Sequence, residues 1–276
     1  MLYDKIDNLK PICSKLGVSL VVDFKPSQKK RRVLIGKEII ASASLGLLYP
    51  FGLGNSEKKS GRKKDQRTLV MIHGWGANRS NLYPLAAYLR LNGIKKILFY
   101  DYPSRLGAER AAVHFREYLK KHVKGGRIDL VCHSMGGIVA RAYLQLLGGH
   151  RRVDRCITLG TPHKGTYNAY WIPTKVGDEL RPDSELIKKL KDTEHLNEKT
   201  EIISIIAGSD NIIIPRVNSG HQNNIFVPDI GHLGMLFSKR VMKEVLGCLK
   251  PSPGLSTEVE TKLKAKIEWR HWPNFG

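Results

Sequence analysis

Three side chains along this chain have neighbours that suit nucleophilic catalysis, and the first of them is Ser134. It lies in the segment CHSMGG, residues 132–137, which follows the apolar run IDLV and precedes a helix-like stretch. A serine hydroxyl is a weak nucleophile, so it needs a base and donors for the oxyanion that it creates. A strand, a sharp turn and a helix would lift Ser134 clear of the backbone, as in a nucleophile elbow. Ser134 is therefore the candidate nucleophile.

Small residues are required on both sides of this serine, because strand and helix pack closely around a strained turn. Gly136 meets the requirement two positions after Ser134. Cys132 meets it only in part, since glycine is usual two positions before the serine. Taken alone, a serine that precedes a helix is also consistent with a simple N-cap.

The donors for an oxyanion are indicated by an upstream segment, HGWGAN, which follows the apolar run TLVMI. A His-Gly pair between a strand and a helix places backbone N–H groups at the carboxyl edge of a sheet. The backbone amides of Trp75 and Met135 are the predicted oxyanion donors. The alternative is a glycine-rich turn with a structural histidine.

The base and its orienting acid are expected later in the chain, in the order serine, acid, histidine. Asp210 comes directly after an apolar strand in IIAGSDNIIIP, and His232 lies in a glycine-flanked loop, DIGHLGMLFS. Asp229 is a competing acid, but it is close to His232 in sequence and follows no strand end. We favour Asp210 as the acid and His232 as the base.

From Thr68 onward, strand-like segments alternate with helix-like segments, and these elements must position the candidate side chains. Apolar runs predict parallel strands at 68–72, 96–102, 128–132, 155–160 and 201–208. Amphipathic stretches predict helices at 81–93, 108–122, 135–147 and 233–249. Residues 163–200 interrupt the rhythm, which is typical of a cap inserted between two strands. We expect three parts: a basic N-terminal extension (1–65), a catalytic domain (66–250, with the cap at about 164–200) and a polar tail (251–276).

The N-terminal extension contains one apolar stretch, Ile39 to Gly54, between basic runs. Its 16 uncharged residues fall short of the about 20 that a membrane-spanning helix needs, and Pro50 would disturb its end. Two interpretations stay open. The stretch lies in the interface of an anionic membrane as a peripheral contact, or it packs on the main domain.

Composition limits the remaining possibilities. The 46 Lys and Arg against 25 Asp and Glu give a net charge of +21, which favours anionic surfaces. Nucleic acid is not the expected partner, because no zinc-finger, helix-turn-helix or RNA-binding signature is present. The four cysteines have no CxxC spacing, so neither a disulfide framework nor a metal site is expected. The first residues lack a secretory signal pattern, which predicts a cytoplasmic location, with membrane association through the extension.

Taken together, four segments resemble the α/β-hydrolase superfamily and, within it, the bacterial triacylglycerol lipases and small esterases. In chain order they are HGWGAN, CHSMGG, ITLGTPHKGT and GHLGMLFS. The resemblance runs from about Thr68 to Leu249, roughly two thirds of the chain. It implies the α/β-hydrolase fold, a mostly parallel sheet with helices on both faces and a small cap. It also implies Ser134 as nucleophile, His232 as base and Asp210 as acid.

The function that the resemblance implies is hydrolysis of acyl esters or lipids through an acyl-enzyme, without metal or organic cofactor. The alternatives are an acyltransferase, a thioesterase or a phospholipase with the same triad, and a noncatalytic binding protein on the same fold. The cap would cover the acyl pocket. Its aromatic side chains would contact substrate or pack in the core, and the candidates are Tyr167, Tyr170 and Trp171.

Overall fold

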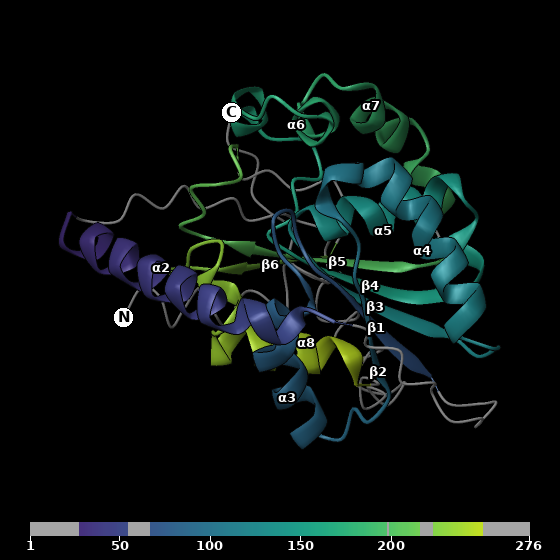
Figure 1. Ribbon diagram of the computed structural model, residues 1–276, viewed down its shortest axis with the longest axis horizontal. Helices are drawn as coiled ribbons and strands as arrows, with labels where there is room; N and C mark the ends of the chain where they lie inside the picture. The colour runs from purple at the N-terminus through teal and green to yellow at the C-terminus, as the bar shows by residue number, and fades with distance from the viewer. Residues whose placement is uncertain (1–27, 55–66, 198, 216–222, 251–276) are drawn as a thin grey trace, which may run out of the picture.

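The computed structural model describes residues 28–54, 67–197, 199–215 and 223–250. Its centre is a six-stranded parallel sheet in the order β2-β1-β3-β4-β5-β6 (Figure 1). The strands are β1 (Thr68–Ile72), β2 (Ile97–Tyr100), β3 (Ile128–His133), β4 (Val153–Leu159), β5 (Glu201–Ala207) and β6 (Asn223–Val227). Every residue of β1 and β3 is buried, which is why both strands are rich in apolar residues.

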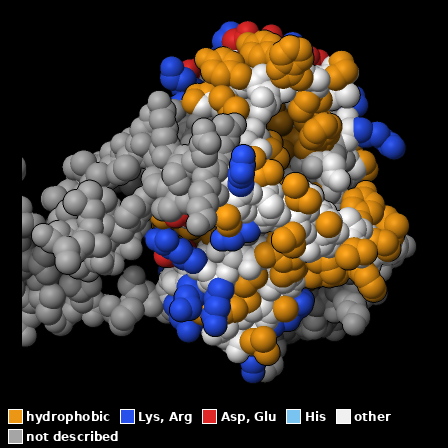
Figure 2. Space-filling model, turned by 90° about the vertical axis from the view of Figure 1, so that its left-hand side faces the viewer, with side chains coloured by type: hydrophobic (Ala, Val, Ile, Leu, Met, Phe, Trp, Pro, Cys, Tyr) orange, Lys and Arg blue, Asp and Glu red, His pale blue; other side chains and the backbone are white. Residues whose placement is uncertain are grey.

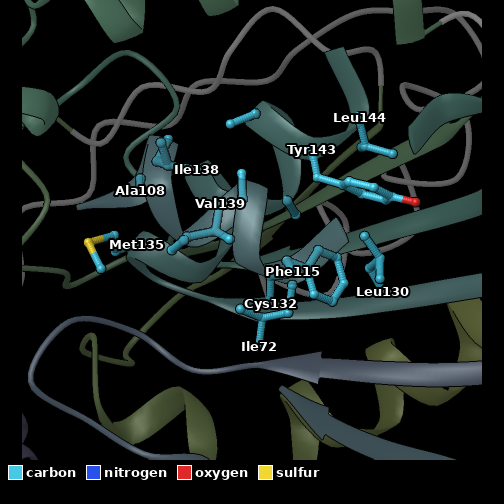
Figure 3. Close-up of a cluster of buried hydrophobic side chains, with 14 of the residues drawn as sticks. Ile72, Ala108, Phe115, Leu130, Cys132, Met135, Ile138, Val139, Tyr143 and Leu144 are labelled. Carbon is cyan, nitrogen blue, oxygen red and sulfur yellow. The ribbon is translucent and has the colours of Figure 1, made fainter. Parts of the chain in front are cut away.

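Helices cover both faces of the sheet (Figure 1). Side chains of α4 (Ala108–His122) and α5 (Met135–Leu146) form one buried cluster with the first face. Figure 3 shows part of this cluster, where Phe115 of α4 and Ile138 of α5 lie above Ile72 of β1. The second face packs on α3 (Tyr83–Leu91) and α8 (Lys239–Leu249). The predicted α/β fold with helices on both faces is confirmed.

Two details of the predicted elements were wrong. Strand β6 was not predicted, because NNIFV begins with two polar residues and lacks the long apolar run that marks the inner strands. The last helix was predicted from Leu233, but α8 begins at Lys239. Residues before it form a short 3-10 helix, η7 (Gly234–Leu236), and Ser238 caps α8 by accepting a hydrogen bond from the Val241 amide.

The segment between β4 and β5 contains η5 (Tyr167–Trp171), α6 (Lys175–Leu180), α7 (Glu185–Asp192) and η6 (Glu194–Asn197). Figure 1 shows α6 and α7 above α5, on the outer side of that layer. Buried Arg141 of α5 donates to the Leu190 carbonyl at 2.8 Å, and Glu179 of α6 accepts from the Ala108 amide at the start of α4. These contacts fix the segment on the sheet-covering helices.

The N-terminal segment is a helix, α2 (Gln28–Leu48), followed by η1 (Tyr49–Gly52). It begins well before the predicted apolar stretch, because Val33, Leu34 and Ile35 extend its apolar character past one charged pair. The window 32–52 has 21 residues and a mean hydropathy of 1.3, long and apolar enough to cross a membrane by length and composition. The length predicted from the sequence counted only the 16 uncharged residues from Ile39 to Gly54, whereas the apolar segment of the structure begins earlier. The proposed extension at 1–27 and 55–65 and the tail at 251–276 lie outside the described residues.

Candidate active site

Ser134 occupies the turn between β3 and α5 with φ 55° and ψ −127°. Only two described non-glycine residues have positive φ, and Ser134 is one of them. Such backbone strain costs of order 1–3 kcal/mol and persists where the surrounding structure enforces it. The turn is held by the Ser134 amide, which donates to the Leu159 carbonyl at 2.9 Å, and by the Gly137 amide, which donates to the Ser134 carbonyl at 3.0 Å. The serine therefore lies on a strained turn at the carboxyl end of a central strand.

Close packing around the turn explains its glycines. A methyl group on Gly136 would lie 2.5 Å from the carbonyl oxygen of His73 and 2.7 Å from that of Ile72. A methyl group on Gly74 would lie 2.9 Å from Cβ of Ser134. Only glycine allows β1 and its loop to approach the elbow this closely. The predicted requirement for a small residue at position 136 is confirmed.

Cys132 replaces the usual first glycine of the elbow without disturbing it. Its side chain is fully buried within the cluster under α4 and α5 (Figure 3). Burial raises the pKa of the Cys132 thiol well above its usual value, so the group stays a neutral, inert thiol. The strand thus tolerates cysteine because its side chain extends into the core.

His232 and Asp210 are hydrogen-bonded to each other. Nδ1 of His232 lies 2.7 Å from Oδ2 of Asp210, and each residue is 2% exposed. The other carboxylate oxygen of Asp210 accepts from the backbone amides of Ile212 and Ile213, both at 2.9 Å. Burial acts to raise the pKa of Asp210, but the hydrogen bonds from His232 and these amides outweigh it and lower the pKa. Asp210 is therefore an ionised acceptor that orients the imidazole.

The ring of His232 lies at the carboxyl end of β4, the strand that pairs with the elbow strand β3. It is against Gly160, where a methyl group would come within 3.1 Å of Nδ1. The carbonyl oxygen of the preceding residue, Leu159, accepts a hydrogen bond from the Ser134 amide. The hydrogen bond to Asp210 leaves Nε2 as the nitrogen that can take a proton. The competing acid, Asp229, is exposed on a turn with φ 57°, whereas Asp210 makes the contact with His232.

The predicted oxyanion segment lies against the serine turn through Gly74. His73 is buried, stacks on Tyr102 at 4.4 Å between ring centroids, and its Nδ1 lies 2.8 Å from the Gly74 carbonyl oxygen. Met135 is the first residue of α5, where a helix leaves backbone amides without helical partners. Trp75 follows Gly74 and is 48% exposed. That Trp75 and Met135 donate to an oxyanion stays a prediction.

His133 is a site residue that we did not single out from the sequence. Its Nε2 lies 3.2 Å from the backbone carbonyl oxygen of His232, and the two rings are 4.8 Å apart between centroids. Burial first, and the neighbouring His232 second, lower the pKa of His133 to about 3. A neutral His133 can donate to that carbonyl and hold the loop of His232. Its position directly before Ser134 was the available signal.

The free energy of unfolding is expected to fall as the pH is lowered from 6.5 to about 4.5. Burial lowers the pKa of both His133 and His73 below the ordinary value of 6.5. His133 therefore binds a proton in this range only on unfolding, which contributes a slope of about 1.4 kcal/mol per pH unit, and the lowered pKa of His73 acts in the same direction. For His133→Gln, the free energy of unfolding measured in urea should change less steeply with pH than for the wild type, by the equivalent of about one bound proton. Equal slopes would contradict the assignment of a neutral, buried His133.

The aromatic residues of the cap are on the surface. The exposed fractions are 56% for Tyr167, 48% for Tyr170 and 86% for Trp171, so core packing does not explain them. The hydroxyl of Tyr170 donates to Asp183 at 2.7 Å. Figure 2 shows hydrophobic side chains around a hollow in the upper part of one face, at the level of α6 and α7 in Figure 1. Contact of these aromatic residues with substrate stays a prediction.

The described residues also bear on whether the chain could hold a metal ion. None of their His, Cys, Asp and Glu side chains form a group of three or more that could hold a metal ion.

Comparison with known proteins supports the fold. Residues 69–195 match the model of the alpha/beta hydrolase family. The mature form of lipase BlEst2 from Bacillus licheniformis is 18% identical, with a TM-score of 0.55 over 71% of this chain and 96% of that chain. The lin2722 product of Listeria innocua is 15% identical, with a TM-score of 0.52 over 69% of this chain and 96% of that chain.

A third solved structure is a membrane phospholipase A described as a bacterial virulence factor. It is 13% identical, with a TM-score of 0.50 over 79% of this chain and 92% of that chain. At these identities the likeness concerns the fold. The parallel sheet, the serine elbow and the match of residues 69–195 to the family model together show that the chain has the α/β-hydrolase fold.

Proposed function

We propose that the protein is a serine carboxylic-ester hydrolase that works through an acyl-enzyme. The observation that carries this proposal is the buried hydrogen bond between His232 and Asp210 beside the strained turn of Ser134. The order serine, aspartate, histidine along the chain is that of α/β-hydrolase triads. Solved structures of similar fold include a lipase and a membrane phospholipase A, which favours acyl esters of lipids as substrates.

In the proposed mechanism, Oγ of Ser134 attacks the ester carbonyl carbon while Nε2 of His232 takes the hydroxyl proton. The tetrahedral intermediate collapses, and His232 passes this proton to the departing alcohol. A water molecule then attacks the acyl-enzyme and gives a proton to His232. As the second tetrahedral intermediate collapses, the acid leaves and His232 returns this proton to Oγ of Ser134. The carboxylate of Asp210 holds the imidazole in the required tautomer and stabilises its charged form. The amides of Trp75 and Met135 stabilise the oxyanion, where one donor is typically worth about 10²–10³ in rate.

The test is hydrolysis of p-nitrophenyl esters from acetyl to palmitoyl, with labelling by a fluorophosphonate probe. Turnover with labelling is expected, and the preferred chain length separates an esterase from a lipase. Release of acid from acyl-CoA would favour the thioesterase alternative. Transfer of the acyl group to an added alcohol would favour the acyltransferase alternative. No turnover and no labelling would overturn the hydrolase and leave a binding role.

We also propose that α2 makes a peripheral contact with an anionic lipid surface. Its outward residues are large and apolar, with Ile40 67% and Leu47 77% exposed, and Phe51 of η1 is 70% exposed. Apolar surface of this kind marks an interaction site. The net charge of +21 favours an anionic partner.

Binding to phosphatidylglycerol vesicles, measured by sedimentation, is expected to exceed binding to phosphatidylcholine vesicles. Leu47→Glu should weaken it about tenfold, because a charge enters the interface. Leu91→Glu is the matched control, since Leu91 is 88% exposed at the end of α3. Equal binding by the two variants would reject this face of α2 as the contact.

A further inference from the structure

Helix α2 contacts the loop that carries His232. The two side-chain oxygens of Glu38 accept hydrogen bonds from the backbone amides of Leu233 at 2.9 Å and Gly234 at 2.7 Å. These amides directly follow His232, although Glu38 precedes them by about 195 residues of chain. We infer that Glu38 is a positioning residue for the catalytic histidine, an inference that rests on the proposed function.

The loop is shaped to receive this carboxylate. A methyl group on Gly231 would lie 2.3 Å from Cδ of Glu38, and one on Gly234 would lie 2.7 Å from its Oε1. Glycines therefore stand on both sides of His232, at the two places where the Glu38 side chain approaches the backbone. The glycines that flank His232 in the sequence are explained by this close approach.

The helix is held firmly enough to act as a support. Leu34, Ala41 and Leu45 form a buried stripe with helical spacing on the same side of α2 as Glu38. The helix contacts η7 next to His232 and also η2 (Arg79–Leu82), which follows the oxyanion segment. Glu38 is therefore fixed by packing on both sides of its own position.

The end of the same segment contacts the oxyanion loop. The side-chain amide of Asn78 donates to the Tyr49 carbonyl at 3.0 Å, and Arg79 donates to the Gly54 carbonyl at 2.6 Å. A methyl group on Gly52 would lie 2.0 Å from the side chain of Asn78. One N-terminal segment thus contacts both the histidine loop and the loop of the predicted oxyanion donors.

The effect on the reaction is expected in kcat. The His232 backbone is held from one side by His133, at its carbonyl oxygen, and from the other by Glu38, at the two amides that follow. Without the carboxylate the loop keeps only the first anchor. A displacement of about 1 Å in a catalytic group costs about a hundredfold in rate. Glu38 does not touch the substrate in this scheme, so KM should change little.

The test compares the full-length Glu38→Ala and Glu38→Gln variants with wild type, using p-nitrophenyl ester kinetics well below each melting temperature. We expect kcat to fall about 10- to 100-fold for Glu38→Ala with KM within about twofold. Glu38→Gln should recover part of the loss, because its amide oxygen can still accept one of the two bonds. Glu117→Gln is the matched control, because Glu117 is an exposed carboxylate on α4 whose partners are Arg116 and Lys120.

Gly231→Ala provides a second route to the same defect. Its methyl group would displace the Glu38 carboxylate without removing it, so kcat should fall as in Glu38→Ala. The double variant Glu38→Ala with Gly231→Ala should be no worse than the poorer single variant, because both changes break one contact. Multiplied losses in the double variant would overturn the inference.

Two further outcomes are decisive. Wild-type kcat in Glu38→Ala, with only a lower melting temperature, would show a purely structural role and overturn the inference while leaving the hydrolase in place. An inactive and unlabelled wild type would instead refute the proposed function. The two failures are therefore distinguishable.

Discussion

Ser134→Gly is expected to abolish ester hydrolysis and stabilise the fold at the same time. Removal of the nucleophile should lower kcat/KM by at least about 10³-fold. Ser134 has φ 55° and ψ −127°, a conformation that glycine adopts without the penalty that a side chain incurs. Release of this strain, less the extra entropy of an unfolded glycine, should raise the free energy of unfolding by up to about 2 kcal/mol. Urea unfolding and ester kinetics on one preparation measure both effects.

Asp229→Gly is the matched control for this result. Asp229 is the other described non-glycine residue with positive φ, at 57°, and it is exposed. Glycine should relieve strain there too, but with wild-type turnover. If Ser134→Gly kept its activity, Ser134 would not be the nucleophile. If it lost stability instead, the strain at the elbow would be wrongly assigned.

Asp210→Asn is expected to lower kcat by about 10⁴-fold while the fold persists. The carboxylate accepts from Nδ1 of His232, whereas an asparagine can present its NH₂ group and favour the other tautomer. The pKa of Asp210 is lowered in the folded protein, so its charge stabilises the fold above the ordinary carboxyl pKa. This contribution disappears as the pH falls through the lowered pKa. Asp210→Asn should therefore be less stable than wild type at pH 7, and the difference should shrink in acid.

Asp229→Asn tests which aspartate acts. The two residues lie on either side of β6 in sequence, and the sequence analysis favoured Asp210 with Asp229 as its competitor. Asp229→Asn should retain wild-type kcat, because Asp229 is exposed and asparagine tolerates positive φ. Kinetics of the two variants on one ester decide the question, and a large loss confined to Asp229→Asn would refute the assignment of Asp210.

The sequence predicted the central sheet well for a physical reason. Inner parallel strands are buried on both faces, so β1, β3, β4 and β5 are rich in apolar residues. Such segments can be recognised from neighbouring residues in the sequence. Edge strand β6 has no such run and was missed. The apolar stretch identified from Ile39 covers only the second half of helix α2, because the charged pair Lys37 and Glu38 marks its boundary in the sequence. Its Glu38 is accommodated by two backbone amides far along the chain.

The sequence by itself determined the α/β fold, the serine turn and the short list of acids and bases, because each depends on residue types close together in the chain. Tertiary structure decided what depends on contacts between distant segments. It shows the hydrogen bond between Asp210, the acid favoured from the sequence, and His232. It also places the His133 ring against the His232 carbonyl oxygen and the Glu38 carboxylate against the amides after His232. Hydrogen bonds of this kind are fixed by how the sheet brings strand ends together, and no local pattern encodes them.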